Sequence, residues 1–287
     1  MKLLVIGSIN IDMVVESSTF PTKGETVIGE SFHTFYGGKG ANQAVCAARL
    51  GSEVSFVGCV GDDRNGKSAL ENLKNNNVDI ESIEVVEDSP TGIASITVSE
   101  NDNTIIIIKG ANDKVTKKMI DKHLTLIKSS DLVLLQLEIP LETASHIIDI
   151  CKENNITTVL NPAPAIKLSK GLIDKVDYIT PNETEYKVIF DCEYNDGLKK
   201  YPNKLIVTKG EDGIDYFDGN EIINIKAHKV QVVDTTGAGD SFNAGLSVAL
   251  MNKVSLKEAI SFGNKVASIS VGKLGAQSSM PYKEDLD

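Results

Sequence analysis

The feature that most constrains the fold is an alternation of strand-like and helix-like segments over most of the chain. Residues 3–8 form an apolar run typical of a buried strand, and Ala41, Ala44 and Ala48 recur at helical spacing until Gly51 ends the pattern. Because strands joined through helices pair in parallel, we expect a three-layer α/β fold, with a mainly parallel central sheet flanked by helices. The same alternation predicts further strands at 54–60, 132–137, 157–160, 177–180 and 204–208, and helices at 63–76, 141–154, 182–190, 242–250 and 256–267.

Two stretches interrupt this alternation. Residues 13–36 and 91–109 carry β-branched or period-2 patterns, with no helical spacing between them. They predict a small antiparallel sheet beside the main one, which could act as a lid over a site, as a subunit interface, or as both. The sequence contains no internal repeat or low-complexity linker, so we expect residues 1–287 to form a single domain.

Charge and cysteine content exclude several classes of function. A formal charge of −11 argues against nucleic-acid binding, which needs a clustered basic surface, and fits simple solubility. The four cysteines lie far apart, and the four histidines lack the spacing of a metal motif. No apolar run approaches the roughly 20 residues that span a bilayer, and no signal-peptide cleavage pattern precedes the first strand. We therefore expect a cytoplasmic protein that binds neither membrane nor nucleic acid.

The strongest chemical signal is the segment Asp-Thr-Thr-Gly-Ala-Gly-Asp at 234–240, just before a predicted helix. Small residues let the backbone approach a ligand, and the N–H groups at a helix start attract anions, so Gly237, Ala238 and Gly239 could cradle a phosphate. An acid beside such a cradle makes sense if Asp240 accepts a proton from an attacking hydroxyl. By spacing alone, an Asp that merely caps the helix is an equally good interpretation. The P-loop pattern G-x-x-x-x-G-K-[ST] is absent.

Two further segments could bind a small polar ligand. The Gly-Gly-Lys-Gly-Ala-Asn segment at 37–42 opens a helix, where Lys39 and Asn42 would supply hydrogen-bond donors, although helix starts often use Gly and Lys. At the end of the first strand, Asn10 and Asp12 alternate to one side of an extended segment, which suits two neighbouring sugar hydroxyls. An ordinary turn rich in Asn and Asp is the alternative there. No G-x-G-x-x-G follows this strand, which argues against a nicotinamide dehydrogenase.

The remaining signals concern nucleotide and metal. Residues 182–185 (Asn-Glu-Thr-Glu) fit a helix N-terminus, or coordination of Mg²⁺ through water near phosphates. Residues 208–213 form a turn that could support a nucleotide. The only arginines, Arg49 and Arg64, lie outside all these segments. Neutralisation of phosphoryl charge would therefore rest on Lys39, Mg²⁺ and backbone N–H groups.

In this order, the segments resemble the ribokinase family, the phosphofructokinase-B type of carbohydrate kinases. The resemblance runs over essentially the whole chain, and so many ordered motifs make a chance match implausible. The Gly-Ser-Ile-Asn-x-Asp, Gly-Gly-Lys-Gly-Ala-Asn-Gln-Ala and Asn-Pro-Ala-Pro-Ala segments are more similar to the ribokinase branch than to fructokinases or nucleoside kinases. The matching residues are 7–12, 20–26, 37–43, 58–63, 136–138, 161–165, 180–185, 234–242 and 275–277.

The resemblance implies a ribokinase-like fold and phosphorylation of D-ribose by ATP at the 5-hydroxyl, with Asp240 as base and 237–239 as anion hole. A kinase for 2-deoxyribose or another small sugar, and a non-catalytic sugar-binding protein, are the alternatives. The antiparallel segments would correspond to the family's β-lid, which also joins two subunits into a homodimer. Two departures are a segment between Glu185 and Thr208 that is shorter than the family pattern and an acid, Glu211, unsuited to phosphate.

The resemblance also assigns binding residues. It implies sugar contacts from Asn10, Asp12, Gly38, Lys39, Asn42, Glu138 and Asp240. It implies ATP contacts from Asn182, Thr208, Gly210, Gly213, Gly239 and Asn264, with Glu185 near Mg²⁺. An activating monovalent cation, K⁺, would lie at Asp234, Thr236, Ser270, Lys273, Gly275 and Ser279.

Overall fold

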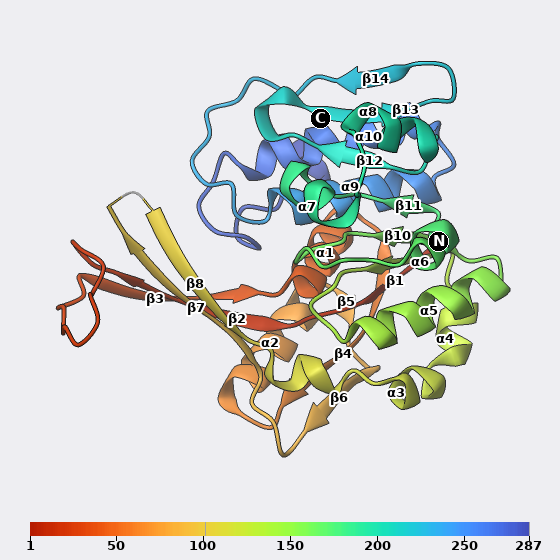
Figure 1. Cartoon of the computed structure of the whole chain (residues 1–287). Coiled ribbons are helices and arrows are strands. Elements are labelled where there is room, and N and C mark those ends of the chain that lie inside the picture. Colours follow the sequence, from red (N-terminus) through yellow and green to blue (C-terminus); the bar gives the residue numbers. More distant parts are fainter. Residues whose placement is uncertain (101, 287) are drawn as a thin grey trace.

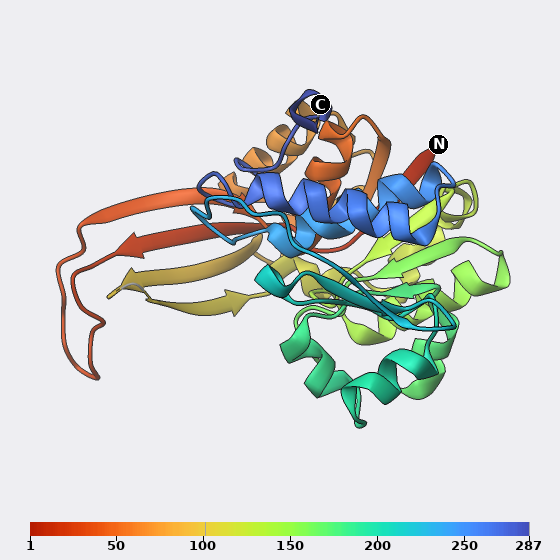
Figure 2. The same ribbon diagram turned by 90° about the horizontal axis from the view of Figure 1, so that it is seen from above.

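The computed structural model describes residues 1–100 and 102–286, and its centre is a seven-stranded sheet between two layers of helices (Figures 1 and 2). Every pairing within this sheet is parallel, as the strand–helix alternation predicts. The strand order is β11-β10-β9-β1-β4-β5, and β6 also pairs with β4. The strands are β1 (Lys2–Ile6), β4 (Glu53–Gly61), β5 (Val78–Asp79), β6 (Ile83–Val86), β9 (Leu132–Leu135), β10 (Thr157–Leu160) and β11 (Tyr178–Ile179).

Alternate side chains of the central strands point to opposite faces of the sheet and pack into two separate hydrophobic cores. Leu3 and Val5 of β1 face one core, and Leu4 and Ile6 face the other. The first core is covered by α1 (Lys39–Arg49), α2 (Arg64–Asn75), α9 (Ala238–Met251) and α10 (Leu256–Ser270). The second is covered by α3 (Lys117–Lys122), α4 (Leu124–Lys128), α5 (Leu141–Glu153), α6 (Lys170–Lys175), α7 (Glu183–Ile189) and α8 (Tyr194–Lys200).

A second sheet projects from the body as an arm, seen at the left of Figure 1. It contains β2 (Asn10–Glu16), β3 (Ser31–Gly37), β7 (Gly92–Ser99) and β8 (Asp102–Ile108), in the order β3-β2-β7-β8. The predicted small antiparallel sheet is thus confirmed, and its middle pair, β2 with β7, runs parallel. Because only three residues separate the end of β1 from the start of β2, the arm joins the central sheet directly at Asn10.

The chain also forms a hairpin sheet. The sequence predicts its first strand at 204–208, as a member of the central parallel sheet, but does not indicate the other two; the structure instead pairs this strand antiparallel in the separate sheet. It consists of β12 (Ile206–Thr208), β13 (Ile214–Phe217) and β14 (Ile222–Ile225), paired antiparallel. Isolated bridges from Ile179 to Leu205 and from Asn182 to Thr208 join it to the β11 edge of the central sheet. Within residues 1–100 and 102–286, three short 3₁₀ helices complete the elements: η1 (Gly110–Lys114), η2 (Gly210–Asp212) and η3 (Lys283–Leu286).

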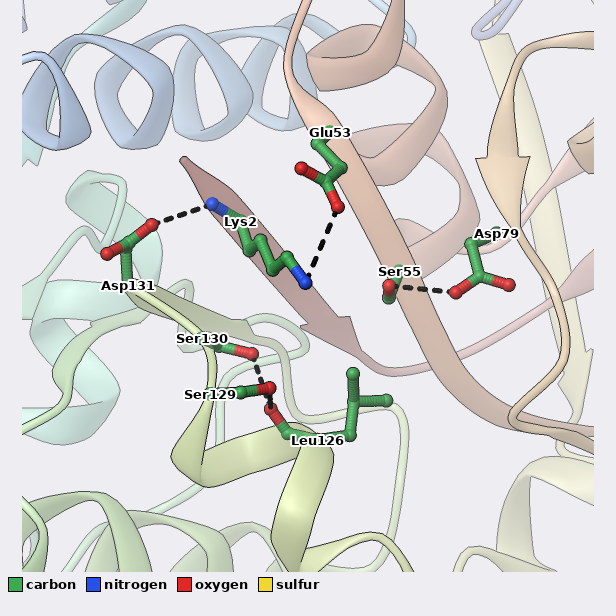
Figure 3. A network of polar contacts seen from close by, with 8 residues as sticks. All are labelled: Lys2, Glu53, Ser55, Asp79, Leu126, Ser129, Ser130 and Asp131. Carbon is green, nitrogen blue, oxygen red and sulfur yellow. Dashed lines mark hydrogen bonds and ion pairs between the residues drawn. The ribbon is translucent and has the colours of Figure 1, made fainter.

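Polar contacts fix the starts of the central strands (Figure 3). The Lys2 backbone N–H donates to Asp131 at 2.7 Å, and its ammonium lies 3.7 Å from the Glu53 carboxylate. On the neighbouring strands, the Ser55 hydroxyl donates to Asp79 at 3.0 Å. These contacts hold the amino ends of the strands, at the edge opposite the cavity described below. Among the described residues, no helix is both long and apolar enough to cross a membrane.

Candidate active site

A cavity of about 220 Å³ opens where the central strands end. Asn161 follows β10, Thr180 follows β11 and Thr208 ends β12, so three neighbouring strands deliver residues to it at their carboxyl ends, as expected for an open α/β sheet. The opposite wall comes from the first turns of α1 and α9. The lining residues are Lys39, Asn161, Ala163, Thr180, Asn182, Glu185, Thr208, Thr235, Gly237, Gly239, Asp240 and Asn243.

The turn before α9 has the geometry of an anion cradle. Gly237 precedes the helix with φ 77°, a left-handed conformation that glycine adopts without strain. A Cβ on Gly239 would meet no atom within 4 Å, so its backbone is open to an approaching ligand. The Ala238 N–H already donates to the Thr235 carbonyl at 3.2 Å. The predicted cradle therefore relies on the N–H groups of Gly237 and Gly239 more than on that of Ala238.

Asp240 does not cap α9. No capping bond from a side chain forms at this helix start within the described residues, and the Asp240 carboxylate turns instead toward α1. Its Oδ2 accepts from Asn42 Nδ2 at 2.9 Å, and its Oδ1 accepts from Gln43 Nε2 at 2.9 Å. The alternative interpretation of Asp240 as a helix cap is thus wrong, because its carboxylate accepts hydrogen bonds from α1 and none from the fully described start of its own helix.

Burial and charge both act on Asp240. Burial raises the pKa of its carboxyl group above the ordinary range, and the nearby Glu138 charge adds to this, while Lys39 and the two amide donors oppose it. For Lys39, burial acts to lower the pKa, but the charges of four carboxylates together outweigh it, so the net pKa is raised; they are Asp240, Glu138, Glu185 and Asp12. The lysine therefore stays charged, beside a carboxylate that binds a proton more readily than an exposed Asp.

The start of α1 is pressed against the loop that follows β1. Gly38 precedes the helix with φ 87°, and a Cβ there would lie 2.7 Å from the backbone nitrogen of Asn10. A Cβ on Gly40 would lie 2.6 Å from that of Ser8. Glu138 joins the two segments, since one of its oxygens accepts from the Ser8 hydroxyl at 2.5 Å and from the Lys39 N–H at 3.0 Å. These glycines therefore serve the contact between two chain segments.

Asn10 and Asp12 lie on β2, with side chains on the same face of the strand, as predicted. The Asp12 carboxylate lies over Gly37, where a Cβ would come within 2.4 Å of its oxygens. Burial, followed by the charges of Glu138 and Asp240, raises the pKa of Asp12 to about 6 despite the lowering effect of Lys39. Asp12, Glu138, Asp240 and Lys39 thus share one electrostatic cluster, although they come from four separate parts of the chain.

The predicted nucleotide residues divide into two groups. Asn182, Thr208 and Gly239 line the cavity, together with Glu185, the residue predicted near Mg²⁺. Asn182 and Glu185 also form a capping box at the predicted start of α7, with reciprocal bonds of 2.8 Å. Gly210, Gly213 and Asn264 lie outside the lining set. A Cβ on Gly213 would meet the Ile225 carbonyl at 2.1 Å, and Asn264 Nδ2 donates to the Lys226 carbonyl at 2.7 Å, so both have structural roles.

The residues predicted for a monovalent cation come from two segments that meet at Asp234. Its Oδ1 accepts from the Thr236 N–H at 2.9 Å, and its Oδ2 accepts from the Gly275 N–H at 2.8 Å. Both bonds help to hold the pKa of Asp234 below its usual value against the opposing effect of burial. Ser270, Lys273 and Ser279 belong to the same C-terminal segment.

Sequence reasoning missed several polar residues at the site. Asn243 lies one turn into α9, where it accepts from the Thr180 hydroxyl at 2.6 Å and donates to the Gly239 carbonyl at 2.8 Å. Asn112 donates to Asn10 Oδ1 at 2.7 Å and also bonds both backbone groups of Ile9. The Asn-Pro-Ala-Pro-Ala segment at 161–165 did signal Asn161, but as a family motif without an assigned role.

Comparisons with known proteins agree with this geometry. The family profile described as "pfkB family carbohydrate kinase" matches residues 1–283. A ribokinase of Bacillus subtilis (strain 168) is 44% identical over 287 residues, 100% of this chain and 98% of the relative. A ribokinase of Lactococcus lactis subsp. lactis (strain IL1403) is 48% identical over 282 residues, 98% of this chain and 94% of the relative. The solved structure of Arabidopsis thaliana ribokinase complexed with ribose and ATP superposes with a TM-score of 0.91 at 32% identity, covering 99% of this chain and 96% of that one.

The raised pKa of Asp12 predicts a pH-dependent cost in stability. The folded-state pKa of about 6 exceeds the ordinary 3.8, so ionised Asp12 destabilises the fold near neutral pH, and this cost disappears as the pH falls through 6 toward 4. Asp12→Asn should therefore raise the free energy of unfolding by about 1–2 kcal/mol near neutral pH and lose this advantage in acid. Urea denaturation of the variant and the wild type, near neutral pH and near pH 4, measures the difference in the free energy of unfolding.

The matched control is Glu16→Gln, at the exposed end of the same strand, which should leave stability unchanged at both pH values. A loss of stability in Asp12→Asn near neutral pH would contradict this account of the carboxylate cluster.

Proposed function

The chain belongs to the pfkB family of carbohydrate kinases, and from this premise we propose that it transfers the γ-phosphoryl group of ATP to the 5-hydroxyl of D-ribose. The observation that carries the proposal is the Asp240 carboxylate, buried on the cavity wall in the first turn of α9, next to the backbone of Gly237 and Gly239. The ribokinases among its relatives and the Arabidopsis complex with ribose and ATP favour this substrate pair.

In the proposed reaction, Asp240 accepts the proton of the 5-hydroxyl as its oxygen bonds to the γ-phosphorus. The bond from that phosphorus to the bridging oxygen of ADP breaks, so ADP leaves and the product is ribose 5-phosphate. The raised pKa of Asp240 suits this role, because a carboxylate with greater proton affinity is a better general base. Gly237 and Gly239 would stabilise the transferring group through N–H donors, and Lys39 would neutralise charge that has no arginine nearby.

The sugar would lie between the arm and the start of α1. We assign Asn10, Asp12, Gly38, Asn42 and Glu138 to this side because they surround Lys39 and Asp240 from β2, α1 and the end of β9. Asp12 can accept from the 2- and 3-hydroxyls of ribose together. A kinase for 2-deoxyribose or another small sugar is the nearest alternative, since one carboxylate does not by itself require the 2-hydroxyl.

The nucleotide would approach from the β12 side, toward Asn182 and Thr208 on the cavity wall, with Gly210, Gly213 and Asn264 further out. The Mg²⁺ that accompanies ATP fits the chemistry of Glu185, a carboxylate on the cavity wall that Asn182 fixes through one oxygen. When bound, the ion would neutralise phosphate charge.

A monovalent cation, K⁺, fits the loops joined at Asp234. The bonds of Asp234 to Thr236 and Gly275 bring carbonyl-bearing turns of the two segments together, and Ser270, Lys273 and Ser279 would contribute to the same site. When bound, the cation would stabilise the turn that holds Gly237.

We further propose a cytoplasmic enzyme in which residues 1–287 form one kinase domain. The free thiols of all four cysteines, each within the described residues, are consistent with that compartment.

The arm is proposed to act as a lid over the sugar and to join two copies of the chain. Its edge strand β8 exposes four consecutive isoleucines, with Ile106 at 69% exposure, and Phe32 of β3 is 61% exposed. An apolar strand left at a sheet edge is a surface that proteins rarely leave uncovered. A second copy would cover it while holding the arm near the sugar.

Asp240→Asn tests the assigned base. The variant should bind D-ribose with little change, because the amide keeps the shape of the side chain, while phosphoryl transfer falls about 10²–10⁴-fold, the usual contribution of a general base. Calorimetry with D-ribose and a coupled ADP-release assay measure the two properties. Asp149→Asn, an exposed ion-pair residue on α5, is the control that should keep full activity. Equal turnover in Asp240→Asn and wild type would remove Asp240 from this role.

Ile106→Lys tests the proposed interface. A charge in the middle of β8 should convert the dimer to a monomer, which sedimentation velocity measures directly. Val254→Lys replaces an exposed apolar residue between α9 and α10 and should leave the association state unchanged. A wild-type chain that sediments as a monomer at high concentration would refute the interface.

A further inference from the structure

The carboxylate of Asp240 is held by a chain of buried side-chain amides that extends beyond the cavity. Gln43 Nε2 donates to Asp240 Oδ1 at 2.9 Å, and the same nitrogen donates to Asn161 Oδ1 at 3.1 Å. The Gln43 Oε1 in turn accepts from Gln136 Nε2 at 2.5 Å. Gln43 and Gln136 are both fully buried, and neither lines the cavity.

This chain fixes which end of the Gln43 amide faces the base. A glutamine amide has a donor end and an acceptor end of nearly equal shape, and rotation by half a turn would aim its carbonyl oxygen at the Asp240 carboxylate. The Gln136 donor prevents this rotation, because it holds the Gln43 oxygen on the side away from Asp240. Gln136 therefore acts on the base through Gln43.

Gln136 holds this position at a cost to stability. Its Oε1 is buried and has no hydrogen-bond partner among the described residues. A buried acceptor without a partner destabilises the fold, and an apolar side chain of the same length would avoid the loss. The retained amide is consistent with a role at the active site, where such costs are concentrated.

A second chain of side-chain amides holds the other oxygen of Asp240 in the same way. Asn42 Nδ2 donates to Oδ2, and Asn42 Oδ1 accepts from Gln277 Nε2 at 3.0 Å. The Gln277 oxygen accepts from Asn72 Nδ2 of α2 at 2.7 Å. Each carboxylate oxygen thus receives one amide donor whose orientation a second glutamine fixes, and lone pairs remain on both oxygens for a substrate proton.

We propose that Gln43 is a positioning residue for phosphoryl transfer: oriented by Gln136, it holds Asp240 in the orientation and charge state that accept the sugar proton. The inference rests on the proposed function, since it concerns the same base. The charged and titratable groups around Asp240 are Lys39 and the Cys46 thiol of α1, Asp12 of β2, Glu138 after β9, and Glu185 of α7. Gln43, like Asn42, is a neutral donor that favours the ionised base from within this cluster.

The test is Gln43→Met, which keeps the length of the side chain and removes its hydrogen bonds. Single-turnover phosphoryl transfer at saturating D-ribose and ATP should slow about tenfold, a part of what the base contributes. The acid limb of its pH profile should move to higher pH, because the ionised base loses a donor. At saturating sugar, bound ribose covers Asp12, so that its titration does not contribute to the acid limb. The KM for ribose should change less than about threefold, since Gln43 lies behind the base.

Gln136→Met should give a smaller shift of the acid limb in the same direction. In the double variant Gln43→Met/Gln136→Met, the loss should equal that of Gln43→Met alone, because Gln136 acts only through Gln43. Ile148→Val, in the core on the other face of the sheet, is the control for stability alone: it should lower Tm without moving the pH profile.

The outcomes separate this inference from the proposed function. A wild-type protein without sugar-dependent ATP turnover would refute the function itself. An active wild type, with an unchanged rate and acid limb in Gln43→Met, would overturn only the proposed positioning role of Gln43. If Gln43→Met does not fold, Gln136→Met decides, because it acts on the base only through Gln43: a shifted acid limb supports the proposal, and an unshifted one refutes it.

Discussion

The burial of one carboxylate between two helix starts is the interaction on which the rest of the site depends. Asp240 lies in the first turn of α9, and its oxygens are held by Asn42 and Gln43 of α1. A buried carboxylate costs free energy unless donors and an opposite charge surround it. The amides supply the donors, and Lys39 supplies the charge. Both helices begin after left-handed glycines, Gly38 and Gly237, which allow the two first turns to come this close.

The same constraint explains how distant parts of the chain cooperate. Because α1 must lie against the loop after β1, the arm that begins at Asn10 is anchored at the side of the cavity proposed for the sugar. The Gln277 contact with Asn42 ties the segment after α10 to the base, and the bond from Gly275 to Asp234 ties it to the turn before α9. Movements of the C-terminal segment therefore reach Asp240 through the hydrogen bonds that Asn42 makes with Gln277 and with the base.

Much of this could be predicted from the sequence, for identifiable reasons. Long apolar runs and helical spacing over ten or more residues predicted β4, α2 and α5 to within one or two residues. Short elements such as α6, α8, β13 and β14 span seven residues or fewer, too few for a period to show. Local spacing gave Asp240 two equal interpretations, and only the contact with residues almost 200 positions away decided between them. Gln43 and Gln136 lie within the family motifs but without an assigned role, and Asn112 carries no local signal, because the roles of all three arise from partners brought together by the fold.

The central claim is that this site phosphorylates a small sugar whose hydroxyl Asp240 deprotonates. It is tested most directly by measuring ADP release with the purified protein across D-ribose, 2-deoxy-D-ribose, D-fructose and adenosine. The account predicts sugar-dependent turnover with the highest kcat/KM for D-ribose. Turnover with 2-deoxy-D-ribose equal to or above that with D-ribose would contradict the substrate assignment, and absence of stimulation by every acceptor would contradict the account as a whole.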